Sequence, residues 1–407
     1  MKLTKNDSIR SGKKIRSWQT CRLPDEKGVD FAEFSWCRDQ MYSPKLSSGR
    51  IRRTTEDANS GAVMEQAWFY NEILEKEPVA AAHLQTRIMA VLACDWRIQC
   101  KDPLVAAEVE EILGRAGIHS LLHHLLHALA FGYSGAAILW GEGGGTIHSF
   151  QKIHPANWNF DPAGTPALLA ANGKICPLTD FHPAQFILHY HISHTALPQR
   201  GGLLRPLLWL YFFKHYAMKD RARYLEKFGI PFLIARIRQD DFDNENIRSS
   251  ILASLSKVGS DGCGVITEGS ELQTLSGHGG NCSEYQSWLE YIDRLFALVI
   301  LGQTASSGNA SGFSRGQIQE NVRHDILESD CRALEESVNR QIIQPLEQYR
   351  YGSSGQVQFR LDYSMPENLK EKAEIVHSLA SGGYHARREW VERVFGIELE
   401  NEKGEKV

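Results

Sequence analysis

The chain has 407 residues, of which 42% are hydrophobic and 23% charged, which excludes intrinsic disorder and suits one large or two to three ordinary domains. Its net charge of −4 excludes a surface built throughout for nucleic acid but leaves room for a local basic stripe. The eight cysteines form no CxxC pair and the N-terminus has no signal-peptide core, so we expect reduced thiols in a cytosolic chain. The most apolar run, LLRPLLWLYFF, is too short to span a bilayer, which predicts a soluble protein with no membrane partner.

The N-terminal half is predicted to begin with an extended polar arm over residues 1–60. Helical spacing of apolar residues, a proline at a helix start, and turns at Gly and Pro then indicate a series of helices and short strands. In chain order these are helices at 61–77 and 78–95, a strand at 95–100, a helix pair over 104–131 broken at Gly117, and short strands at 135–140, 146–153, 157–160 and 186–191.

The C-terminal half is dominated by long helices. A helix over 207–228, about 30 Å long at 1.5 Å per residue, is followed by a small β-α-β unit. That unit is expected as strand 232–237, helix 245–258 and strand 264–269. The chain then continues with a helix over 283–300, a loose polar stretch over 302–316 and a helix over 314–348. A strand at 357–362 and helices at 366–381 and 385–395 complete the predicted elements. Two long helices thus bracket a compact module, and a ring of copies would bury such a helix pair better than one chain does.

Two histidine-rich stretches are candidates for a metal site. His119, His123 and His127 recur at every fourth residue of one predicted helix, and His189, His191 and His194 follow a predicted strand. A zinc-protease helix needs Glu directly after its first His, and that position holds His124. We therefore favour structural histidines over ligands and predict no metal and no cofactor.

A glycine-rich stretch, GEGGGT at 141–146, resembles a phosphate loop in composition only. It lacks the Lys-Ser/Thr of the Walker pattern and opens no helix, which favours a hairpin turn. The chain also has no G-x-S-x-G elbow and no kinase signature. These observations predict a protein that is not an enzyme.

Two stretches could contact a polyanion. In the helix over 207–228, five basic residues outnumber Asp220 and Glu226, and in a ring they would repeat around a channel and attract DNA without reading its sequence. They are Lys214, Lys219, Arg221, Arg223 and Lys227. The second is the polar stretch over 302–316, whose candidate contact residues are Gln303, Thr304, Ser306, Ser307, Asn309, Ser311 and Arg315. A solvated helix face and a flexible linker are the alternatives.

Three stretches together give the chain a family resemblance. They are EKEPVAAAHLQTRIMAVLACDWRI at 75–98, RGGLLRPLLWLYFFKHYAMKDRARYLEKFGIPFLIARI at 200–237, and YIDRLFALVILGQTAS at 291–306. In order and spacing, the chain from about 60 to 395 resembles the portal proteins of Mu-like tailed phages. Two departures are the Ala-Ser-Ser that follows Gln303-Thr304 and a short C-terminus.

The resemblance implies an α+β portal fold with a wing, a helical stem, a β-α-β clip, a tunnel loop and a small helical crown. The implied boundaries are an arm at 1–59, wing at 60–205 and 317–363, stem helices at 206–229 and 282–301, clip at 230–281, tunnel loop at 302–316, and crown with tail at 364–407. The loose polar stretch would then point into the channel, where tight contacts would stall moving DNA.

The resemblance also implies a function and a set of partners. The chain would form a ring, usually of twelve copies, at one capsid vertex, through which double-stranded DNA enters and leaves without sequence readout. A terminase large subunit would dock on the clip and hydrolyse ATP, capsid and scaffold proteins would meet the wing, and head-completion proteins would follow the motor. The protein would reside in the virion, after assembly in the host cytoplasm. The alternatives are a metal-dependent enzyme using the 119–127 histidines and a monomeric DNA-binding adaptor using the basic helix.

Overall fold

The computed structural model describes residues 45–141, 144–170, 173–191, 194–228, 233–258, 263–267, 282–303, 313–352, 355–364, 369–384 and 386–397. The chain divides into two compact units, Met1–Asp362 and Tyr363–Val407. Within the described ranges, no helix is both long enough and apolar enough to cross a membrane.

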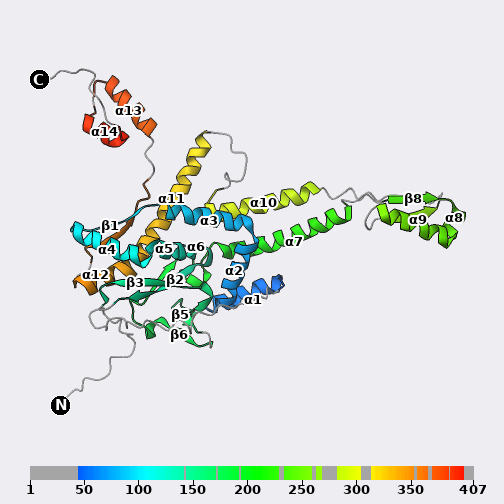
Figure 1. Ribbon diagram of the computed structural model, residues 1–407, viewed down its shortest axis with the longest axis horizontal. Helices are drawn as coiled ribbons and strands as arrows, with labels where there is room; N and C mark the ends of the chain where they lie inside the picture. The colour runs from blue at the N-terminus through cyan, green and yellow to red at the C-terminus, as the bar shows by residue number, and fades with distance from the viewer. Residues whose placement is uncertain are drawn as a thin grey trace, which may run out of the picture. The chain divides into compact units, whose positions relative to one another are not determined.

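Three helices open the first unit (Figure 1): α1 (Ser48–Asn59), α2 (Met64–Lys76) and α3 (Pro78–Leu92). The predicted extended arm is wrong for 48–59, and residues 1–44 lie outside the described ranges. The helix α1 forms because the Ser47 hydroxyl accepts a hydrogen bond from the Arg50 amide and because Ile51 and Ala58 are buried on one face. Pro78 occupies the first turn of α3, as predicted.

Two three-stranded sheets lie in this unit. In the first, β2 (Tyr133–Trp140) lies between β3 (Ile147–Ile153) and β7 (Phe186–Tyr190), and all pairs are antiparallel. In the second, β5 (Pro166–Leu169) lies between β4 (Trp158–Phe160) and β6 (Ile175–Pro177). Residues from both sheets share a core around the fully buried Trp158. The helices α4 (Pro103–Ala116), α5 (Ile118–Leu126) and α6 (Ala128–Phe131) precede β2, and Gly117 ends α4 in the left-handed region, where the sequence predicts the break.

A third, two-stranded sheet joins distant parts of the chain. The strand β1 (Trp96–Gln99) pairs antiparallel with β10 (Gln358–Leu361). The long helix predicted over 314–348 is interrupted: α11 (Phe313–Val338) passes through a π turn at Asn339–Ile343 into α12 (Gln344–Tyr351). The widened turn accommodates Pro345, which has no amide hydrogen to donate to the preceding turn. The Asn339 side chain, inside this turn, exchanges two hydrogen bonds with the backbone of Phe359 in β10.

Two long helices lie against each other, and one of them also lies against α3. They are α7 (Leu204–Phe228) and α10 (Cys282–Leu301), and α10 contacts both α7 and α3 (Figure 1). The β-α-β unit predicted between them is confirmed. It has β8 (Leu233–Ile237) parallel to β9 (Cys263–Thr267), with α9 (Glu245–Val258) and an additional short helix α8 (Gln239–Asp243) in the crossover.

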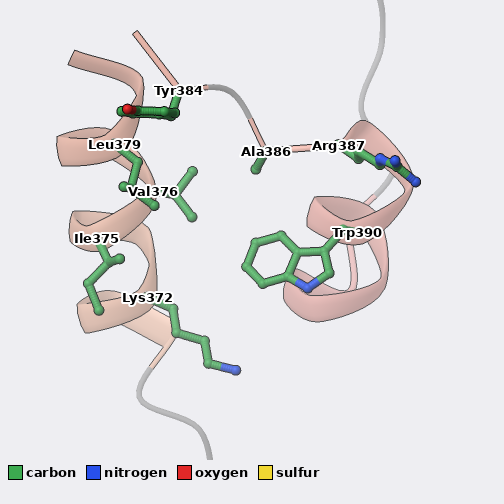
Figure 2. Close-up of a pocket in the computed structure, with 8 residues that line it drawn as sticks. All are labelled: Lys372, Ile375, Val376, Leu379, Tyr384, Ala386, Arg387 and Trp390. Carbon is green, nitrogen blue, oxygen red and sulfur yellow. The ribbon is translucent and has the colours of Figure 1, made fainter. Parts of the chain in front are cut away.

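The second unit contains α13 (Leu369–Ser381) and α14 (Arg388–Phe395), as the sequence predicts. An apolar groove of about 580 Å³ lies between them, and Figure 2 shows Val376 pointing toward Trp390 across it. No side chain is fully buried among the residues described in this unit.

Candidate functional site at the base of the α7–α10 helix pair

A buried lysine connects three helices where α7 meets α10. The Lys214 amine, on α7, lies 2.6 Å from Glu77 Oε1 and 2.6 Å from Asp293 Oδ1. Glu77 caps the N-terminus of α3, and Asp293 lies on α10. Lys214 is only 6% exposed, so its charge is stabilised by these two carboxylates rather than by water. One amine therefore ties α7 to α3 and to α10.

An arginine forms a second connection nearer the end of α10. The Arg87 guanidinium, on α3, makes a bidentate ion pair with Asp330 of α11, at 2.7 Å and 2.9 Å. Its remaining nitrogen donates a hydrogen bond of 2.8 Å to the Ile300 carbonyl. That carbonyl belongs to the last turn of α10, whose acceptors lack partners within the helix. Arg87 therefore holds α3, the end of α10 and the middle of α11 together.

Gly302 turns the chain directly after this connection. Its φ is +69°, and its amide donates a 3.0 Å hydrogen bond to the Leu298 carbonyl. A Cβ at this position would lie 2.8 Å from Ile326 Cδ1 on α11. Gln303 is the last residue described before 313, and α11 begins at Phe313, so Arg87 holds the end of α10 three residues before this point.

Most of the predicted channel residues fall outside the described ranges. Gln303 is half-buried, and its side-chain oxygen is buried without a hydrogen-bond partner. Arg315 lies on the described backbone of α11, but its side chain is not described. The remaining predicted contacts all lie between 304 and 312: Thr304, Ser306, Ser307, Asn309 and Ser311.

The prediction that Lys214 belongs to an exposed basic face is wrong. Lys214 is buried in the junction described above. By contrast, Lys219 is exposed, Arg221 is half-buried, and Arg223 Nη1 lies 3.8 Å from Asp220 Oδ1. The side chain of Lys227 is outside the described ranges. The burial of Lys214 could have been predicted from its spacing in the sequence. It follows, at intervals of three and four residues, a stripe of buried side chains on the same helix: Leu204, Leu207, Leu208 and Tyr211.

Four of the six histidine candidates lie within packed protein, whereas His119 and His194 are exposed. The His123 and His127 rings are 5.2 Å apart, and burial lowers the pKa of His127 to about 4. Burial likewise lowers the pKa of His189 to about 4, and its Nδ1 lies 2.9 Å from the Ser337 hydroxyl. His124 has its Nε2 within 3.1 Å of the carbonyls of Gly135 and Ile153. No group of three metal-ligating side chains occurs among the residues that the structure describes.

The anchors come from the three stretches that carry the resemblance. Arg87 lies in the first and Lys214 in the second, and their partners Ile300 and Asp293 lie in the third, so these contacts bring the three stretches together. The family model described as the portal protein of Mu bacteriophage matches residues 67–397. The chain belongs to this family. The predicted membership in the Mu-like portal proteins is thereby confirmed.

Two curated relatives agree with the family. The chain is 24% identical over 380 residues to the Mu-like prophage FluMu protein gp29 of Haemophilus influenzae, covering 88% of this chain and 72% of that protein. It is 25% identical over 318 residues to the portal protein of Escherichia phage Mu, covering 75% of this chain and 61% of that protein. The chain therefore spans about three fifths of the Mu portal protein.

Solved structures show the same fold at low sequence identity. A chain from the neck of an empty gene transfer agent particle, computed with C6 symmetry, has a TM-score of 0.52 at 11% identity, covering 79% of this chain and 91% of its own. A chain from the virion of a native gene transfer agent particle also has a TM-score of 0.52, at 12% identity, covering 86% and 99%. The α+β portal fold predicted from the sequence is confirmed.

Proposed function

We propose that this portal protein forms a closed ring at one vertex of a phage head, and that double-stranded DNA passes through the ring during packaging and ejection. Membership of the Mu portal family carries the proposal. The activity is then structural rather than enzymatic, and it needs no cofactor. A separate terminase would supply the ATP-driven work, while capsid, scaffold and head-completion proteins would contact other parts of the ring. The virion would be the site of residence, and assembly would take place in the host cytoplasm.

The uncovered faces of the helix pair support assembly into a ring. On α7, Trp209 and Phe213 are 38% and 48% exposed, and both rings contact Phe212. On α10, Trp288 and Tyr291 are 47% and 49% exposed and lie against each other. Exposed aromatic side chains gathered in this way are typical of interaction sites. Neighbouring copies packed around an axis would cover them.

The parts of the ring follow from the order of elements. The wing is proposed as 60–205 with 317–363. The helix α1 precedes it and packs on it, because Arg50 of α1 forms a buried ion pair with Glu72 of α2 at 2.8 Å. The helices α7 and α10 form the stem, within 206–229 and 282–301, and the β-α-β unit within 230–281 forms the clip. The tunnel loop is 302–316, held at its base by Arg87, and 364–407 is the crown.

The ring is tested by measuring particle mass with native mass spectrometry and particle shape with electron microscopy. The wild type is expected as a closed ring of roughly a dozen subunits with an axial hole. Trp209→Glu/Phe213→Glu should leave folded subunits that do not close, while Leu104→Glu, on the exposed start of α4, should assemble normally. If the variant closes into a ring like the wild type, the exposed face of α7 is not part of the interface between subunits. A monomeric wild type with steeply salt-dependent DNA binding would favour a DNA-binding adaptor instead.

The role of the tunnel loop needs a separate experiment. Residues 305–313 are replaced by a short rigid turn, which leaves Arg87, Asp330 and the Ile300 carbonyl in place. Ring assembly should be unchanged and DNA packaging impaired. Normal packaging by this variant would show that the loop has no part in translocation.

A further inference from the structure

Two cysteines meet beside the Arg87 anchor. Cys94 lies in the turn after α3, and Cys331 lies on α11, directly after the Asp330 that Arg87 binds. Their sulfur atoms are 4.0 Å apart, although 237 positions separate them in the sequence. Both are free thiols, and they join α11 to the turn directly after α3, the helix that Arg87 joins to α11.

We propose that Cys94 and Cys331 are a site of oxidative modification, at which a low-molecular-weight disulfide converts the two thiols into an intramolecular disulfide that ties α3 to α11. The inference is independent of ring formation, because both residues belong to one chain. The sulfurs must approach from 4.0 Å to about 2 Å, and rotation of the cysteine side chains about χ1 is the movement that would bring them together.

Accessibility sets the order of the two steps. Cys94 is half-buried, whereas Cys331 is fully buried, so Cys94 reacts first. Its thiolate attacks one sulfur of oxidised glutathione, which forms a mixed disulfide and releases one glutathione thiolate. The Cys331 thiolate then attacks the Cys94 sulfur, forms the protein disulfide and releases the second glutathione. Two protein thiols are oxidised, one glutathione disulfide is reduced, and the two cysteine protons end on the released glutathione or in solvent.

The surroundings of the two thiols slow their reaction at neutral pH. Burial raises the pKa of Cys94, the contact with the Cys331 thiol lowers it in part, and the carboxylates of Asp362 and Asp95 raise it further. Burial also raises the pKa of Cys331, with added repulsion from Asp330 and Glu335. Because the thiolate is the reactive form, exchange is slow at neutral pH and accelerates as the pH rises. The pair thus responds to prolonged oxidising conditions rather than to brief ones.

The expected consequence is a stiffer connection between α11 and the turn after α3. Arg87 already joins α3, α11 and the end of α10 through an ion pair and hydrogen bonds. A disulfide beside it would restrict the unfolded chain as well, because it closes a very long loop. Oxidation should therefore raise the midpoint of thermal unfolding by roughly 5 °C.

The test treats reduced full-length protein with oxidised glutathione, blocks the remaining thiols and maps the peptides without reduction. We expect a peptide pair joined through Cys94 and Cys331, a faster reaction at about pH 9 than at about pH 7, and the thermal shift. Cys94→Ala should lose both the cross-link and the shift, whereas Cys100→Ala, which removes another half-buried thiol, should retain them. Cys331→Ala should stop at a glutathione adduct on Cys94.

Three results would overturn the proposal. The first is a wild-type adduct on Cys94 that Cys331 never displaces. The second is a cross-link from either residue to a different cysteine, and the third is a Cys94–Cys331 link that forms only in denaturant. Each would mean that the native fold does not bring the two sulfurs into reach.

Discussion

Replacing Lys214 by Met should destabilise the protein far more than the loss of a surface charge would. The substitution keeps much of the side-chain volume but removes the cation that lies 2.6 Å from both Glu77 and Asp293. The side chain of Glu77 is only 5% exposed, so its carboxylate would be left buried without its cation. Breaking a buried pair in this way costs about 3–5 kcal/mol of unfolding free energy.

The measurement is urea unfolding followed by circular dichroism, at one protein concentration so that assembly contributes equally to every variant. Lys219→Met is the matched control, because Lys219 lies on the exposed side of the same helix, and it should change the unfolding free energy by less than about 0.5 kcal/mol. Lys214→Met/Glu77→Gln/Asp293→Asn should recover much of the loss, because it removes the unpaired charges as well. A Lys214→Met variant as stable as the control would refute the reasoning.

Three further predictions concern other parts of the chain. Gly302→Ala should cost about 1–2 kcal/mol in urea unfolding, because its backbone is left-handed, whereas Ile326 Cδ1, 2.8 Å from the new methyl group, is the end of a side chain that can rotate away. Gly352→Ala, also left-handed, should lose about as much, and a loss below about 0.5 kcal/mol for Gly302→Ala would contradict the strain. Burial lowers the pKa of His127 and of His154 to about 4, so as the pH falls the unfolded chain binds protons before the folded chain does. The unfolding free energy should therefore fall between about pH 6.5 and about pH 4, by up to about 3 kcal/mol for each histidine. The urea midpoint of His127→Gln/His154→Gln should depend less on pH than that of the wild type, and an unchanged dependence would refute this. Ending the chain after Ser364 should leave the thermal midpoint of the first unit within about 2 °C of its value in the full-length chain, because β10 and its pairing with β1 are retained. A larger fall in a calorimetric scan would show that the second unit stabilises the first.

Local signals predicted most of the element order. Periodic apolar residues marked the long helices, and Gly117 and Gly302 ended helices where the sequence placed the breaks. The strands β5 and β6 were missed because they are only four and three residues long and each contains a proline. The helix α1 was missed because its sequence is mostly polar, and only its packing on α2 and the Arg50–Glu72 ion pair reveal its buried face.

The junction was beyond prediction from one sequence. Periodicity places Lys214 on the buried face of its helix, so its burial could have been predicted. Its partners could not, because Glu77 and Asp293 lie 137 and 79 positions away. The same limit applies to Arg87, whose ion partner Asp330 is 243 positions away. Motif similarity identified the right stretches but carried no information about which charges meet.

The two anchors together restrict how α10 can move. Lys214 holds it at Asp293 and Arg87 holds it at Ile300, two points about 10 Å apart at 1.5 Å per residue. Sliding α10 by one helical turn along α7 or α3 would break both contacts and leave buried charges unpaired. The base of the helix pair is therefore fixed by charge, whereas the outer faces of α7 and α10 present apolar rings to solvent. Arg87→Met would leave the Asp330 carboxylate, only 6% exposed, without its cation and the Ile300 carbonyl without its donor, so it should lower the free energy of urea unfolding as Lys214→Met does.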